Sequence, residues 1–100
     1  AGDVQINPLN IQKTFQNIEK HYGQLAKKNR KIIALGGDHS IAYPILKTIK
    51  KIHGPFTLIH FDAHTDTADQ AWGEKFHHGT PMRRLAVLTN FRSMTRQSLH

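Results

Sequence analysis

Cysteine is absent from this sequence of 100 residues, and that absence removes two classes of structure. Without thiols the chain can form neither a disulfide framework nor a thiolate metal site, so any metal ligands must be imidazoles or carboxylates. An apolar run of about 18 residues is also missing, which excludes a transmembrane helix within the sequence. No basic patch leads into an apolar stretch as in a signal peptide. Because the chain begins at Ala1 rather than Met, we expect that a preceding piece is missing.

Acidic residues are scarce as well, with 7 Asp and Glu against 14 Lys and Arg, which gives a formal net charge of +7. Such a basic chain could bind nucleic acid or an anionic membrane. However, the basic residues are scattered along the sequence, and no aromatic side chains interleave with them as a base-stacking platform requires. We therefore expect solvated helix and loop surface, with neither a nucleic-acid nor a membrane partner.

An amphipathic helix is predicted near the start of the chain. Asn7 followed by Pro8 is typical of an N-cap residue with proline at the first helical position. After this helix, the unbroken apolar run 32–35 indicates a strand buried on both faces, and Gly36-Gly37 ends it. The helical stripe, at steps of four and three residues, consists of Ile11, Phe15, Ile18, Tyr22 and Leu25.

A second helix and a second strand follow. Ser40 is a candidate N-cap, and Pro44 falls in the first turn, where proline is tolerated. Gly54-Pro55 stops this helix, and residues 56–61 indicate another buried strand. The order helix, strand, helix, strand predicts an α/β fold with a parallel sheet. The stripe of the second helix consists of Ile41, Ile45, Ile49 and Ile52, with Leu46 beside them.

Metal-competent side chains follow both predicted strands. The first strand runs into Gly36-Gly37-Asp38-His39-Ser40, and the second runs into Asp62-Ala63-His64-Thr65-Asp66. Ligands of open parallel sheets bind beyond the carboxyl ends of the strands, so the two clusters face each other if the strands are neighbours. Asp62, His64 and Asp66 alternate along the chain, and in an extended segment alternate side chains project toward one point.

These side chains suit a divalent cation such as manganese, because carboxylates are mixed with imidazole and no thiolate is present. Three of them on one segment, together with His39, exceed what one tetrahedral ion needs. We therefore expect a pair of ions roughly 3.5–4 Å apart, with a bridging carboxylate. Taken singly, each residue has a simpler explanation: Asp38 could cap the following helix, and a lone histidine is more often a hydrogen-bonded surface or core residue. Packed together without a role, the groups would repel or remain unsatisfied.

These two segments resemble the first two signature motifs of the ureohydrolase family, which includes arginase, agmatinase, formimidoylglutamase and guanidino-acid hydrolases. The resemblance covers about residues 1–85. It implies an arginase-like fold, three-layer α/β/α with a parallel sheet, of which residues 1–100 form only part. Residues 86–100 depart from the family pattern, and a third motif with two further aspartate ligands is absent. The likeness to agmatinase is particularly strong in His60-Phe61-Asp62-Ala63-His64-Thr65-Asp66-Thr67, Gly73-Glu74-Lys75 and His78-Gly79-Thr80-Pro81.

The resemblance also implies roles for individual residues. His39 and Asp66 would bind one manganese ion, His64 would bind the other, and Asp62 would bridge both. Asp38 is not a ligand in the family and would help to orient the residues that bind the metal.

The implied reaction is manganese-dependent hydrolysis of a linear guanidino compound by a hydroxide that bridges the two ions. Agmatine, giving putrescine and urea, is the favoured substrate. The alternatives are a guanidino acid such as guanidinobutyrate, and a non-catalytic truncated product. His78, followed by Gly79, matches a family histidine proposed to shuttle protons, whereas its competitor His77 lacks the adjacent glycine. A complete enzyme is expected to form a homo-oligomer, in mitochondria or in the cytoplasm.

Two other classes of protein stay open. Related metal-dependent deacetylases share the arginase-like architecture but use one zinc ion and an Asp-x-His site, and Asp66 argues against them. A basic chain could also be a nucleic-acid-binding module, which steeply salt-dependent binding would reveal. Because the third motif is missing, we expect the chain alone to bind manganese weakly and to release little urea.

Overall fold

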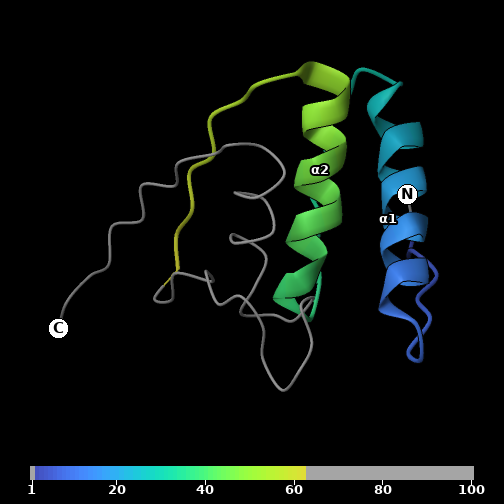
Figure 1. The fold of residues 1–100 in the computed structure, drawn as a ribbon. Coiled ribbons are helices and arrows are strands. Elements are labelled where there is room, and N and C mark those ends of the chain that lie inside the picture. Colours follow the sequence, from blue (N-terminus) through green and yellow to red (C-terminus); the bar gives the residue numbers. More distant parts are fainter. Residues whose placement is uncertain (1, 63–100) are drawn as a thin grey trace, which may run out of the picture.

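The structure is a computed structural model that describes residues 2–62. Its regular elements are two α-helices, α1 (Ile11–Ala26) and α2 (Ala42–His53), with the short 3-10 helix η1 (His39–Ile41) leading directly into α2. Extended chain connects α1 to η1 and follows α2 (Figure 1). Neither described helix is long and apolar enough to cross a bilayer.

The first helix is capped three residues later than predicted, at Asn10 instead of Asn7. The Asn10 side chain accepts a hydrogen bond from the Lys13 backbone N–H at 3.0 Å and so caps α1. Asn7 instead closes the preceding turn: its carbonyl accepts from the Asn10 N–H, and its side chain accepts from the Leu9 N–H at 3.0 Å. The prediction of Asn7 as the cap was therefore wrong, because Asn10 offers the same acceptor and Pro8 is accommodated within the turn.

The second helix is also capped differently from the prediction. The Asp38 carboxylate accepts from the Ser40 N–H at 2.8 Å and caps η1, so Ser40 itself is not the N-cap. Pro44 lies in the first turn of α2 as predicted, and its carbonyl accepts from the Thr48 hydroxyl at 2.8 Å. Gly54 ends the helix with a positive φ of 76°, a conformation that costs glycine little.

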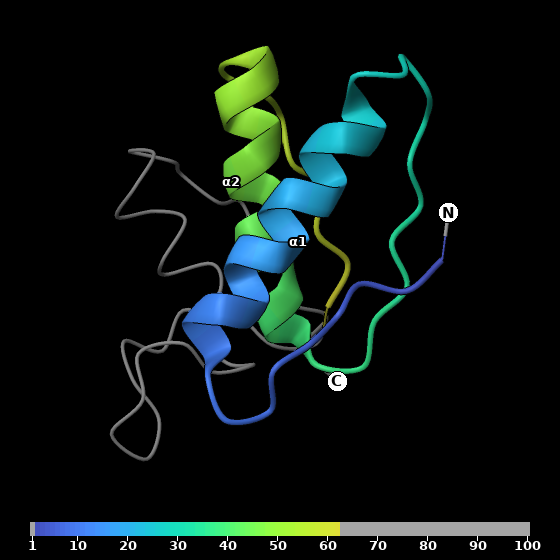
Figure 2. The same ribbon diagram turned by 90° about the vertical axis from the view of Figure 1, so that its right-hand side faces the viewer.

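The two helices lie side by side and run in the same direction (Figure 2). At their contact, the rings of Phe15 and Tyr43 are 5.7 Å apart between centroids and tilted by 44°, a favourable aromatic arrangement. Three partly buried residues pack around this pair: Ile11, Leu46 and Leu58.

The predicted stripe of α1 is confirmed, since Phe15 and Ile18 are its buried residues. The stripe of α2 is only partly right. The buried residues of α2 are Tyr43, Pro44 and Thr48. The isoleucines of the expected stripe are less buried than these, and Ile52 is exposed. The reason is that α2 turns its Tyr43 and Thr48 face toward α1, where Thr48 packs beside Gly23.

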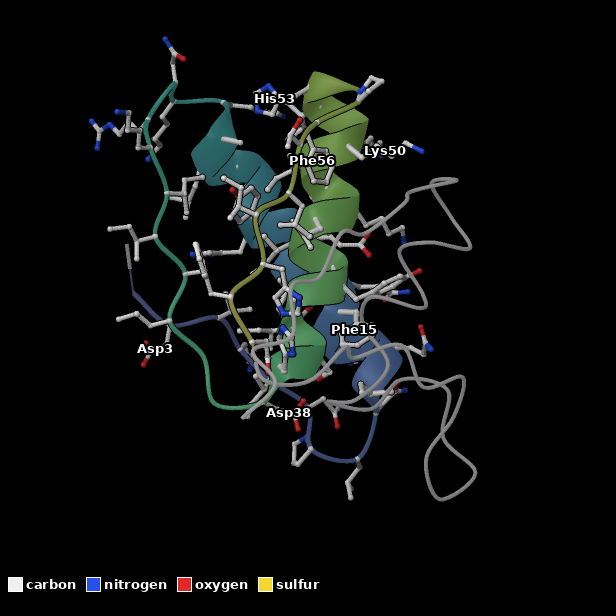
Figure 3. The ribbon with its side chains drawn as sticks, turned by 90° about the vertical axis from the view of Figure 1, so that its left-hand side faces the viewer. Asp3, Phe15, Asp38, Lys50, His53 and Phe56 are labelled. Atoms are coloured by element: carbon white, nitrogen blue, oxygen red, sulfur yellow. The ribbon has the colours of Figure 1, made fainter. Side chains whose placement is uncertain are left out.

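The predicted strands are present as extended segments that form no hydrogen-bonded strand within residues 2–62. Segments 32–35 and 56–61 run in the same direction, opposite to the helices, as the strands of a parallel sheet would (Figure 3). The side chains of Ile33, Leu35 and Phe61 are 87%, 93% and 94% exposed, so burial on both faces was wrong for the described chain. A strand needs a ladder partner and two covering layers, and the described residues supply helices on one side only.

Candidate metal centre

The turn before η1 carries the first candidate ligand. Gly36 lies so close to Ile41 that a Cβ atom added at Gly36 would collide with the Ile41 side chain. Two residues later the Asp38 carboxylate holds the Ser40 N–H, and His39 is fixed between these two partners at the start of η1. The glycine and the capping aspartate therefore determine where the His39 imidazole lies.

The second candidate segment alternates between two environments, as extended chain does. Leu58 is partly buried against the cluster formed by Phe15 and Tyr43. His60 is likewise partly buried, whereas Ile59 and Phe61 on the opposite side are exposed. Asp62 follows in the same register as His60. This alternation turns His60 and Asp62 toward the helix layer and toward the end at which α2 begins.

Three potential ligand atoms converge at that end. The Nδ1 atom of His39 lies 3.9 Å from Oδ2 of Asp62, and Nε2 of His60 lies 3.6 Å from the same oxygen. The two imidazole rings are 5.5 Å apart between centroids and tilted by 30°. One ligand atom from each residue lies within 4.8 Å of the others. Figure 3 shows Asp38 at this end of the structure and His53 and Lys50 at the other.

This donor set fits a divalent cation. Nitrogen and oxygen ligands bind such ions at about 2.0–2.2 Å, so two ligands of one ion can be at most roughly 4.4 Å apart. The separations of 3.6 and 3.9 Å from the Asp62 oxygen lie within that limit. Neutral imidazole and carboxylate without thiolate suit zinc, manganese and related ions rather than copper(I). The arrangement can therefore hold a metal ion and polarise a group bound to it.

The structure brings together two of the predicted ligands, His39 and Asp62. Asp38 binds the Ser40 N–H, which is the capping role considered for it, and through that bond it supports the turn that carries His39. The remaining predicted site residues, His64, Asp66 and His78, lie outside the described residues.

His60 was missed by the sequence reasoning. It was assigned only to the strand, although it precedes Asp62 by two residues and so continues the alternation of Asp62, His64 and Asp66 backwards along the chain. Extending that period by one step would have identified it, because residues two apart in an extended segment share a side.

The family model described as "Arginase family" matches residues 1–96 of this chain. The chicken protein named "Agmatinase, mitochondrial" is 48% identical over 84 residues, which are 84% of this chain and 25% of that protein. The human protein named "Guanidino acid hydrolase, mitochondrial" is also 48% identical, over 83% of this chain and 24% of its own length. This chain thus spans about a quarter of these relatives.

Solved structures agree with the sequence matches. The crystal structure of formimidoylglutamase from Bacillus subtilis superposes with a TM-score of 0.80 at 33% identity, covering 88% of this chain and 28% of that one. The α/β class predicted from the order of elements is thus supported by this likeness, although the described residues contain helices alone as regular structure. With a family match that extends over nearly its whole length, this chain belongs to the arginase family.

Proposed function

We propose that this chain supplies the first two metal-binding segments of a manganese-dependent hydrolase that splits a linear guanidino compound into urea and an amine. The observation that carries the proposal is the convergence of His39 and Asp62, which come from turns separated by the whole of α2. Both lie at the same end of the structure, where extended segments of one direction finish. The names of the relatives, an agmatinase and a guanidino acid hydrolase, support the same class of reaction.

Four residues are proposed to hold the ions. His39 and Asp62 belong to the described site, and His64 and Asp66 continue its alternation beyond residue 62. When bound, a pair of divalent ions supplies the Lewis acidity that lowers the pKa of water toward neutrality. The mixture of carboxylate and imidazole ligands is compatible with manganese.

The remaining chemistry falls to the side chains. A guanidinium group is stabilised by resonance, so its carbon accepts water only when the developing tetrahedral species is held by fixed charges. The carboxylates of Asp62 and Asp66 are proposed to hold the ions and to offset part of their charge, since addition of hydroxide to the guanidinium cation gives a neutral tetrahedral species. As the bond from carbon to the amine nitrogen breaks, that nitrogen must gain a proton. We assign its delivery to His78, because imidazole titrates near neutral pH.

The substrate is proposed to be agmatine, with a guanidino acid such as guanidinobutyrate as the second candidate. The two kinds of relative are equally similar, both at 48% identity, so overall identity does not separate them. They differ chemically at the far end, since agmatine carries an ammonium group and a guanidino acid carries a carboxylate. The residues that read that end need not lie in this chain.

Grafting tests whether these segments are catalytically competent. The segment of chicken agmatinase that matches this chain would be replaced by the corresponding segment of this chain. Urea release would then be measured in the presence of Mn2+, with agmatine or guanidinobutyrate as the substrate. We expect urea release in the graft. Asp62→Asn should reduce it at least about a hundredfold, because a proposed ligand of the ions that stabilise the reacting charges is lost.

The matched control is His53→Asn, which changes a histidine at the opposite end of α2 and should leave the rate unchanged (Figure 3). A folded graft that binds Mn2+ but releases no urea from either compound would contradict the proposal. Equal effects of the two substitutions would contradict the assignment of Asp62.

A further inference from the structure

His60 lies against both predicted ligands of the described site. Its Nε2 atom is 3.6 Å from Oδ2 of Asp62, and its ring lies 5.5 Å from the ring of His39. It therefore lies on the same extended segment as Asp62 and faces the turn that carries His39. The resemblance assigned no role to this residue, and the proposed reaction does not use it.

Burial distinguishes His60 from its two neighbours. The side chain of His60 is 11% exposed, whereas those of His39 and Asp62 are 32% and 27% exposed. The more covered position of His60 places it behind the ligands, on the side of the helix layer, where Leu58 of the same register packs on the core.

We propose that His60 is a positioning residue for the metal ligands, an inference that rests on the proposed function. Its Nε2 atom faces Oδ2 of Asp62 at 3.6 Å, beyond hydrogen-bond length, so an N–H there attracts the carboxylate and still leaves its lone pairs for the ions, while the His60 ring limits the rotation of the His39 imidazole. Groups that hold metal ligands in this way commonly change metal affinity by about 10–100-fold when removed. The charge state of His60 need not change for this role.

Mn2+ titration of the 100-residue chain, followed by the electron paramagnetic resonance signal of free Mn2+, tests the inference. His60→Leu should weaken Mn2+ binding by about tenfold. His60→Gln should stay within about threefold of the unsubstituted chain, because its side-chain amide offers an N–H near the position of Nε2. In an Asp62→Asn background, His60→Leu should have little further effect, since the carboxylate through which it acts is gone.

The other outcomes overturn the inference in distinguishable ways. If His60→Gln binds Mn2+ as weakly as His60→Leu, and the circular dichroism of the metal-free chain is unchanged, then His60 is a metal ligand and not a positioning residue. Unaltered affinity in His60→Leu would remove any role of His60 and leave the proposed function intact. Absence of Mn2+ binding by the unsubstituted chain would contradict the inference, whereas the proposed function is tested separately by urea release from the graft.

Discussion

Asp38 and Asp62 lie near the same site but interact with different groups. Asp38 accepts a hydrogen bond from the Ser40 N–H and so belongs to the backbone of the turn. Asp62 instead faces the imidazole of His39 at 3.9 Å, as a ligand of a shared cation would, and the imidazole of His60 at 3.6 Å. The Asp38 cap shapes the turn that carries His39, and this turn brings the His39 imidazole to 3.9 Å from Asp62, its proposed partner in metal binding.

Gly36 is expected to be the more sensitive of the paired glycines. In Gly36→Ala the new Cβ would collide with the end of the Ile41 side chain, which must change rotamer at a cost of about 1 kcal/mol. Mn2+ binding should change little, because the Ile41 side chain can move without the turn that carries His39. Gly37→Ala is the matched control: a Cβ there meets nothing within 4 Å, and its effect should stay within about 0.5 kcal/mol. Urea denaturation and Mn2+ titration of both variants measure this, and similar losses of stability in the two would contradict it.

The candidate residues could be found in the sequence because their types and spacing are chemically restrictive. Asp62 was identified by alternation, and His39 by its place after an apolar run and two glycines. His60 was missed because a histidine inside an apolar run fits a strand equally well, although its spacing of two residues from Asp62 was a signal and its distance of 3.6 Å from that carboxylate supports it. The Asp38 cap was foreseen as the simpler explanation of that residue.

At the scale of elements, α1 and α2 are joined mainly by apolar contact. The Phe15 side chain is 3% exposed and packs on Tyr43, while Glu19 and Lys47 form an ion pair at 2.9 Å on the outer surface. Surface ion pairs contribute little because water solvates both partners well, whereas removal of a buried ring leaves a cavity.

Phe15→Ala should therefore destabilise the helix pair by about 3 kcal/mol or more. The control is Glu19→Gln, which removes the ion pair with Lys47 and should cost less than about 1 kcal/mol. Urea denaturation of the 100-residue chain, followed by circular dichroism, compares the two. A larger loss in Glu19→Gln than in Phe15→Ala would contradict the account of the interface.

Helix positions were predictable from the sequence, but helix ends and one buried face were not. Periodicity locates α1 well because one side packs on a neighbour. Its start depends on whether Asn7 or Asn10 caps, and both offer the same chemistry. In α2 the predicted stripe was only partly right, because the contact of Tyr43 with Phe15 sets the rotation of the helix within the described residues.

At the scale of the whole molecule, the exposed apolar residues follow from how much of the fold the chain contains. Ile33, Leu35, Ile59 and Phe61 all lie on the extended segments, and the chain spans about a quarter of its curated relatives. The sequence predicted parallel strands and their shared direction. It could not predict whether they would pair, since pairing depends on chain that lies outside the described residues.

The central claim is that His39 and Asp62 bind the same cation. Nuclear magnetic resonance tests it most directly, because a trace of Mn2+ broadens only the signals of nuclei close to the bound ion. As Mn2+ is added to the 100-residue chain, the imidazole signals of His39 and His60 should broaden first, together with the Asp62 backbone amide. Those of His21 on α1 and His53 at the far end of α2 should stay sharp. A sharp His39 signal beside a broadened Asp62 would contradict the shared site and the function built on it.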